Sequence, residues 1–246
     1  MLKAVLFDMG NTLLDYHAGP SSDDEKDDKG LRAMAQRLAT WGHPVSHELL
    51  LNEFYRPWVA LFPKRKQEVR EFDLVPLLSC AIPVEELNAE QIKRLLLDFH
   101  EPSALEAIMD DGTHDSLHRL KTSGIKIGMI SNSAVPGYCH DRTLARLGLL
   151  SIIDFRLYSY DQGIRKPHRE LFLRALKAAD STPETTVMIG DSWELDLAPA
   201  CQLGLRVLQY HSPRRGKKTA FPVPPHLSLG QIETIPAAEG LLKHLI

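Results

Sequence analysis

Short apolar runs recur along the chain and predict buried β-strands. A weak run lies at residues 226–229, and the clear ones lie at residues 4–7, 125–130, 155–159, 186–189 and 206–209. Segments with helical periodicity join four of the clear runs. Because parallel strands need crossover connections, this alternation predicts an α/β fold with a parallel sheet and helices on its faces.

The connecting segments have recognisable helix ends. Thr113 is suited to cap a helix that carries Leu117 and Leu120 and stops at Gly124. Residues 169–179 place four apolar side chains on one face, and a helix over residues 195–203 ends at Gly204. These helices are the expected crossovers of the sheet.

The stretch between the first two strands has a different pattern. Residues 16–108 contain no strong strand signal, and Asn88 followed by Gln91 is typical of a capping box at a helix start. A further apolar stripe at helical spacing comprises Leu31, Met34, Ala35 and Leu38. We therefore expect a helical domain at 16–108, inserted into a core made of residues 1–15 and 109–246.

An acidic run, residues 21–28, lies near the start of this insertion. Clustered carboxylates can bind calcium, but this run lacks the glycine and the terminal glutamate of an EF-hand loop. We expect a solvated hinge loop here.

The composition excludes several classes of protein. The 246 residues are 43% hydrophobic with a net charge of -3, which favours neither nucleic acid nor a membrane surface as a partner. Three isolated cysteines favour reduced thiols, and no apolar run is long enough for a signal sequence or a membrane span, so we expect a cytoplasmic protein. The basic segment 214–218 is expected to be a surface loop. The oligomeric state is left open.

Functional side chains follow four of the expected strands. They are Asp8, then Ser131 with Asn132, then Lys166 in the loop after the third strand, and Asp191 followed by Asp196. In an open parallel sheet, ligands bind beyond the carboxyl ends of the strands, so these side chains are expected to converge.

This set of side chains is suited to phosphoryl transfer. Asp8 can attack phosphorus and form an aspartyl-phosphate. Asp8 and Asp191 offer hard oxygen ligands for Mg²⁺. Lys166 would neutralise the phosphate oxygens, and Ser131 would donate a hydrogen bond to one of them. Asn132 is a further candidate for binding the substrate.

The motifs "FDMGNTL", "ISNS", "RKP" and "GDSWELD" occur in this order, and with them the sequence resembles the haloacid dehalogenase (HAD) superfamily of phosphohydrolases. The resemblance implies a Rossmann-like, doubly wound core with an inserted helical cap. It also implies that Asp8 is the nucleophile and that Asp8, Asp191 and the backbone carbonyl of Gly10 hold Mg²⁺. The resemblance further implies that Thr12 hydrogen-bonds around the loop after Asp8 and that Asp196 lies near the metal and Lys166 without binding the metal directly.

The sequence departs from that pattern at Gly10. Most phosphatases that resemble this chain carry there a second aspartate, which protonates the leaving group and then activates water. A missing general acid typically costs about 10²–10⁴ in rate. Three outcomes follow: substrates with good leaving groups, a substitute proton carrier such as Asp15, His17 or a cap residue, or loss of hydrolysis.

These features leave three functions to compare. The leading one is a Mg²⁺-dependent phosphatase that acts on a small phosphorylated metabolite. A 2-haloacid dehalogenase also lacks the second aspartate, but it typically lacks a carboxylate at the position of Asp191 as well. The third is a non-catalytic protein that keeps the fold to bind a phosphorylated ligand, which Gly10 would favour.

Overall fold

The computed structural model describes residues 1–212, 214 and 220–245, and within them the chain forms one six-stranded sheet in the order β3-β2-β1-β4-β5-β6. All neighbouring strands pair in parallel. The strands are β1 (Ala4–Phe7), β2 (Lys126–Ser131), β3 (Phe155–Tyr158), β4 (Thr186–Gly190), β5 (Arg206–Tyr210) and β6 (Ser228–Ile232). The expected parallel sheet is confirmed, with the sixth strand slightly further along the chain than its apolar run. Apart from Arg214, the basic segment 214–218 lies outside the described residues.

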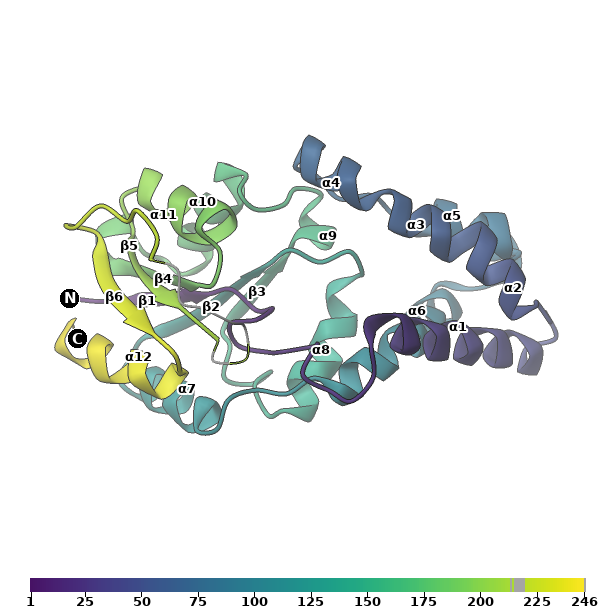
Figure 1. The fold of residues 1–246 in the computed structure, drawn as a ribbon, viewed down its shortest axis with the longest axis horizontal. Helices are drawn as coiled ribbons and strands as arrows, with labels where there is room; N and C mark the ends of the chain where they lie inside the picture. The colour runs from purple at the N-terminus through teal and green to yellow at the C-terminus, as the bar shows by residue number, and fades with distance from the viewer. Residues whose placement is uncertain (213, 215–219, 246) are drawn as a thin grey trace.

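Helices cover both faces of this sheet (Figure 1). Val5 and Phe7 of β1 pack towards the face that also buries side chains of α7, α8 and α12, whereas Leu6 packs with α10 and α11 on the opposite face. This alternation follows from the two-residue period of a strand. The helices are α7 (Thr113–Thr122), α8 (Gly137–Arg146), α9 (Ser159–Gln162), α10 (Arg169–Ala178), α11 (Ala198–Gln202) and α12 (Ile235–Leu242), with the shorter turns η3 (Pro183–Thr185), η4 (Trp193–Leu197) and η5 (Lys243–Leu245).

Residues 16–108, which we call the helical insertion, project from one side of the sheet (Figure 1). Their apolar side chains form a cluster in which Leu31, Met34 and Leu38 meet Leu95 and Phe99. Two residues that follow β2, Val135 and Cys139, belong to the same cluster. The elements are α1 (Asp23–Thr40), α2 (His47–Leu49), η1 (Leu50–Tyr55), α3 (Arg56–Ala60), α4 (Phe62–Glu68), α5 (Val75–Ala81), η2 (Val84–Glu86) and α6 (Ala89–Glu106). The capping box of Asn88 and Gln91 is present at the start of α6.

Two helix starts differ from the sequence prediction. The acidic run at 21–28, expected to be a loop, instead forms the first turns of α1, so that prediction was wrong. Ser22 caps the helix reciprocally with Glu25, and carboxylates are stabilised near the N-terminus of a helix dipole. Thr113 is the first residue of α7, and Gly112 holds the cap position in its place.

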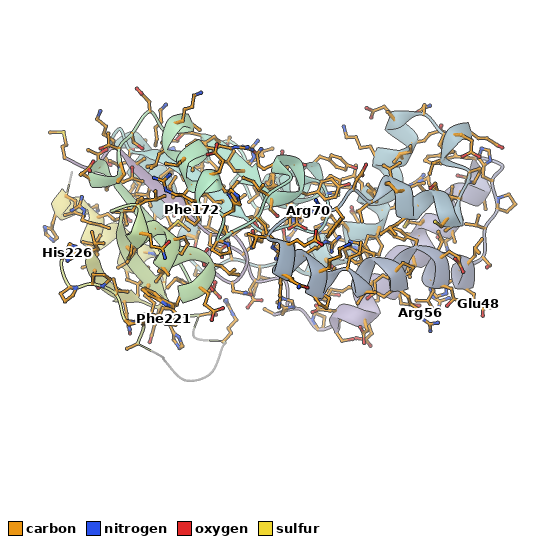
Figure 2. All side chains as sticks on the ribbon, turned by 90° about the horizontal axis from the view of Figure 1, so that it is seen from above. Glu48, Arg56, Arg70, Phe172, Phe221 and His226 are labelled. Atoms are coloured by element: carbon orange, nitrogen blue, oxygen red, sulfur yellow. The ribbon has the colours of Figure 1, made fainter. Side chains whose placement is uncertain are left out.

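The insertion contacts the core through the packing of α6 against α8 and through two backbone pairings. At its ends, Asp15 and Ile108 exchange two backbone hydrogen bonds of 2.8 and 3.0 Å. Midway along it, Arg70 forms a bridge with Ile164; we call this pairing of residues 69–71 with 163–165 the side contact. Arg70, labelled in Figure 2, lies where the insertion meets the core, and Glu48 lies at the far end of the insertion. The side contact ends directly before Lys166.

No helix in the described part of the chain combines the length and apolar character that crossing a membrane requires.

Candidate active site

The two aspartates that follow β1 and β4 meet at the carboxyl edge of the sheet. β1 lies between β2 and β4, and Phe7 is in register with Ile189. The backbone N–H of Asp8 donates to the carbonyl of Ile189 at 2.9 Å, so Asp8 and Asp191 leave adjacent strands side by side. From β1 the chain continues to β2 and β3 on one side of the sheet, and β4, β5 and β6 follow on the other side. Ligands bind at such a reversal of strand order in doubly wound sheets.

Lys166 lies between two carboxylates of this edge. Its Nζ donates to Asp8 Oδ1 at 2.5 Å and to Asp196 Oδ1 at 2.6 Å, and its side chain is only 2% exposed. Burial by itself would lower the pKa of Lys166, but the charges of Asp196 and Asp8 outweigh burial and raise it. The lysine is therefore a fixed positive charge beside the candidate nucleophile.

Asp191 completes a cluster of carboxylates with Asp8 and Asp196. One oxygen of each lies within 4.8 Å of the others. The pKa of Asp196 is raised to about 7, because burial and the neighbouring charges of Asp8 and Asp191 together outweigh the opposing effect of Lys166. Three carboxylates thus face one ammonium group, and these hard oxygen donors fit the ligand preference of Mg²⁺.

Gly190 allows Asp196 to reach this cluster. A Cβ atom at position 190 would lie 2.6 Å from Cβ and 2.7 Å from Cγ of Asp196, closer than atoms can approach. The backbone N–H of Ser192 also donates to Asp196 Oδ2 at 3.1 Å. The glycine of the "GDS" motif therefore has a packing role behind the site.

Asn132 holds the backbone of Lys166. Its Oδ1 accepts from the Lys166 N–H at 2.7 Å, and its Nδ2 donates to the Lys166 carbonyl at 3.0 Å. Asn132 thereby links the end of β2 to the loop that carries the lysine. Ser131, which ends β2, is also buried beside this loop.

Gly10 and Asn11 form the turn after Asp8. Asn11, not Gly10, adopts the left-handed conformation, with φ of 65°. Asparagine tolerates this region better than most residues, so Asn11 is suited to set the turn. A Cβ atom at Gly10 would meet nothing within 4 Å, so the position of the absent second aspartate faces open space.

Two other candidate residues lie near this loop. Thr12 is buried, and among the described residues its hydroxyl has no hydrogen-bond partner. Asp15 lies at the attachment of the insertion, where its Oδ1 accepts from the His17 N–H at 2.8 Å. Asp15 lines a small hollow together with Thr12, and it does not line the larger cavity that Gly10 borders.

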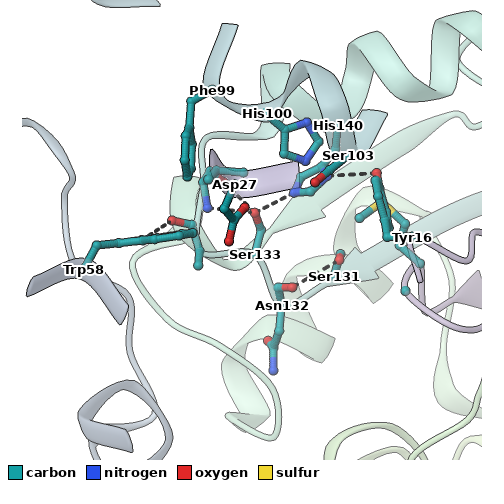
Figure 3. A pocket seen from close by; sticks show the side chains of 14 residues that line it. Tyr16, Asp27, Trp58, Phe99, His100, Ser103, Ser131, Asn132, Ser133 and His140 are labelled. Carbon is teal, nitrogen blue, oxygen red and sulfur yellow. Dashed lines mark hydrogen bonds between the residues drawn. The ribbon is translucent and has the colours of Figure 1, made fainter. Parts of the chain in front are cut away.

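A cavity of about 230 Å³ lies between the insertion and this edge of the sheet (Figure 3). Gly10 forms part of one wall. The insertion contributes Asp27, Trp58 and Phe99. The complete lining comprises Met9, Gly10, Tyr16, Asp27, Trp58, Phe99, His100, Ser103, Ser131, Asn132, Ser133, Ala134, Val135 and His140.

Two histidines form part of the cavity wall, and the pKa of each is lower than that of a free imidazole. His140 shares hydrogen bonds with Tyr16 Oη (3.0 Å) and Ser133 Oγ (2.7 Å), and its ring centroid is 4.8 Å from that of His100 (Figure 3). Burial lowers the pKa of His100 to about 4 and that of His140 well below its usual value. Both imidazoles are therefore neutral at pH 7.

Most residues of this cavity wall carry no recognisable signal in the amino-acid sequence. His100 and His140 are 40 positions apart, and nothing in their local sequences indicates that their rings meet. Asp27 is part of the acidic run that we expected to be a solvated loop. The helical stripe of α1 could have identified it: Asp27 is one helical turn before the buried Leu31 and so shares its face.

Strand order and site together define a doubly wound α/β protein with an acidic, lysine-containing site at its switch point. A family model described as haloacid dehalogenase-like hydrolase matches residues 2–204, and the chain belongs to this family of enzymes. The recognition made from the four motifs is therefore confirmed.

Several relatives and solved structures are similar over most of the chain. Glyceraldehyde 3-phosphate phosphatase of Pyrococcus furiosus is 24% identical over 213 residues, covering 85% of this chain and 80% of that protein. Ribulose-1,5-bisphosphate 5-phosphatase of Halopiger xanaduensis is 26% identical, covering 85% of each. The crystal structure of a HAD phosphatase from Thermococcus onnurineus has a TM-score of 0.62 at 18% identity and covers 98% of each chain, which confirms the fold.

Proposed function

We propose that this protein is a Mg²⁺-dependent phosphatase that acts on a small phosphorylated metabolite through an aspartyl-phosphate on Asp8. In this proposal the helical insertion, residues 16–108, acts as a cap over a core made of residues 1–15 and 109–246. The organic part of the substrate occupies the cavity between them. The relatives named as sugar-phosphate phosphatases support this class of substrate.

The observation that carries the proposal is the position of Lys166. Its buried ammonium group pairs with Asp8 and Asp196, and an oxygen of Asp191 lies within 4.8 Å of oxygens of both carboxylates. Carboxylates this close together repel one another, and a bound divalent cation would relieve this repulsion. A divalent ion and a phosphoryl group together satisfy this arrangement.

The side chains have separate roles in this reaction. An Asp8 oxygen attacks phosphorus, the bond from phosphorus to the ester oxygen breaks, and water later cleaves the acyl phosphate. Lys166 and the Ser131 hydroxyl stabilise the charge on the phosphoryl oxygens. Asp8, Asp191 and the carbonyl of Gly10 would hold Mg²⁺, which supplies Lewis-acid stabilisation of the same charge. Asn132 keeps Lys166 in place through its backbone.

The direct test measures phosphate release from a panel of phosphorylated metabolites with Mg²⁺ present. We expect Asp8→Asn to reduce turnover of any substrate by at least about 10³-fold, because the amide cannot form the covalent intermediate. Circular dichroism and thermal unfolding should show that the variant is folded. Equal turnover by the wild type and a folded Asp8→Asn protein would contradict the proposal.

Gly10 supports one alternative, a protein that binds a phosphorylated ligand without turnover. This alternative predicts thermal stabilisation by phosphate esters and Mg²⁺ while acetyl phosphate and p-nitrophenyl phosphate stay intact. A dehalogenase, in contrast, would release chloride from 2-chloropropionate in EDTA. The carboxylate of Asp191 within the acidic cluster argues against that chemistry.

A further inference from the structure

The cavity beside Gly10 has an unusual balance of charge for an enzyme that handles anions. Among its fourteen lining residues there is one carboxylate, Asp27, and no lysine or arginine. His100 and His140 add no positive charge at neutral pH. The ammonium group of Lys166 faces Asp8 and Asp196 instead of this cavity.

Arg65 of the insertion does not change this balance. Arg65 is buried against the rings of Trp58 and Phe62, with its guanidinium carbon 5.7 and 4.9 Å from their centroids. Its Nε lies 3.2 Å from Glu71, and Arg65 is not part of the cavity lining. Within the described part of the chain, the cavity lining therefore offers no lysine or arginine that could pair with a second anionic group.

Asp27 is positioned so that it can accept a hydrogen bond from a hydroxyl group of a ligand. Its Oδ2 accepts from the Tyr55 hydroxyl at 2.6 Å, while its Oδ1 makes no hydrogen bond to any residue that the structure describes. The neighbouring Lys26 anchors this part of α1, because its buried Nζ donates to the carbonyl of Tyr16 at 2.6 Å. The carboxylate thus has one fixed oxygen and one oxygen available to a ligand.

Another side of the cavity is apolar and aromatic. Trp58 and Phe99 lie with their ring centroids 5.4 Å apart in an edge-to-face arrangement, and Trp58 Nε1 donates to the carbonyl of Ala134 at 3.3 Å (Figure 3). Flat apolar faces beside hydroxyl-binding groups suit a carbon chain that carries hydroxyls. The volume of about 230 Å³ is below the range typical of drug-sized ligands.

We propose that this cavity selects phosphate monoesters whose organic part is a short, uncharged, hydroxyl-bearing chain, and that Asp27 rejects esters with a second anionic group. This inference rests on the proposed phosphatase function. It disfavours substrates that carry a carboxylate or a second phosphate, because like charges brought close together repel one another. Asp27 acts here as a specificity residue and takes no part in the transfer of the phosphoryl group.

The test compares substrates that share a carbon skeleton and differ by one anionic group. Glyceraldehyde 3-phosphate and 3-phosphoglycerate share a three-carbon skeleton, and ribulose 5-phosphate and ribulose 1,5-bisphosphate share a five-carbon one. We expect kcat/KM of the wild-type protein to be at least about tenfold higher for the first member of each pair, mainly through KM. Equal values within both pairs would overturn the inference and leave the phosphatase proposal intact.

A variant pair assigns the selection to one side chain. We expect Asp27→Asn to reduce the ratio of the two kcat/KM values about tenfold, because the amide carries no charge that repels a second anionic group. Asp24→Asn, which makes the same charge change on an exposed residue of α1, should retain the wild-type ratio. An Asp27→Asn protein with the full wild-type ratio would overturn the role of Asp27.

The inference can also be measured without turnover. In the Asp8→Asn protein with Mg²⁺, we expect glyceraldehyde 3-phosphate to raise the unfolding temperature more than 3-phosphoglycerate does. If no ester is hydrolysed by the wild type, the phosphatase proposal fails, and this difference in stabilisation still decides the charge selection. Equal stabilisation by the two esters would contradict it.

Discussion

At the scale of single residues, the loop after Asp8 places the left-handed backbone conformation and the missing second aspartate at two different positions. The turn needs a left-handed residue, and Asn11 meets this need. Gly10 is outside that region and faces open space, so its backbone conformation does not require glycine. The absence of a side chain at position 10 is therefore a chemical property of the site.

Restoring a carboxyl group at this position should broaden the range of leaving groups. We expect Gly10→Asp to fold normally and to increase kcat for alkyl phosphates by about 10²-fold, because a general acid contributes about 10²–10⁴. Acetyl phosphate, whose leaving group needs no proton, should change little. Steady-state phosphate release measures both, and Gly10→Asn is the control of similar size. An equal gain in the asparagine variant would contradict a proton-transfer role.

The acidic cluster leads to a prediction for the metal. Without Mg²⁺, we expect Asp191→Asn to be more stable than the wild type, since one of several neighbouring like charges is removed. Mg²⁺ at about a hundred times its Kd should stabilise the wild type by about 2.7 kcal/mol and the variant much less. Thermal unfolding in EDTA and in Mg²⁺ measures this difference. The same increment in both proteins would place the ion elsewhere.

At the scale of elements, α1 shows why the start of a helix can be mistaken for a loop in the sequence. The run of carboxylates at residues 23–28 has the composition of a solvated loop, but the reciprocal cap of Ser22 and Glu25 makes it a helix start. The capping box of α6 was recognised because an apolar stripe follows it directly. In α1 the stripe begins only at Leu31, so the charged first turns looked unstructured.

The contact of α1 with α6 depends on one glycine. A Cβ atom at Gly30 would lie 2.2 Å from the carbonyl oxygen of Phe99, whereas one at Gly240 in α12 would meet nothing within 4 Å. We expect Gly30→Ala to lower the free energy of unfolding by about 1–3 kcal/mol through overpacking. Gly240→Ala should raise it by about 0.5–1 kcal/mol through helix propensity. Urea unfolding compares the pair, and equal shifts would show that α1 and α6 are not tightly packed.

At the scale of the whole molecule, the sheet could be predicted because each strand is marked by its own apolar run. Asp8, Lys166, Asp191 and Asp196 were then brought together by one topological rule for parallel sheets. The cavity could not be predicted in this way, since its walls come from the insertion and the core together. Which side chains of α1, α3 and α6 face Gly10 depends on how the two parts dock, and no local pattern encodes that.

Acid should destabilise the protein through the two histidines of the cavity wall. Both have a pKa below the usual 6.5 in the folded state, with His100 at about 4, so below pH 6.5 the unfolded chain binds protons that the folded one refuses. The free energy of unfolding then falls with decreasing pH, by up to about 1.4 kcal/mol per pH unit for each histidine.

The histidine contribution can be isolated with variants. Between pH 6.5 and 4, we expect the slope of unfolding free energy against pH to be shallower in His100→Gln than in the wild type. His118→Gln, at an exposed position, should keep the wild-type slope. Urea unfolding at several pH values gives these slopes. A His100→Gln slope equal to that of the wild type would mean that His100 takes up a proton in the native fold.

The side contact has a mechanical consequence. If the insertion acts as the proposed cap, it would move about the crossing segments at Asp15 and Ile108, but residues 69–71 also pair with residues 163–165, immediately before Lys166. Glu71 strengthens this tie through Ser159 and Arg165. An outward movement of the insertion that breaks this pairing would also displace the loop that carries Lys166. Under the proposed function, catalysis would then require the closed arrangement, and Asp8 would become accessible to bulk solvent only after its ion pair with Lys166 is disturbed.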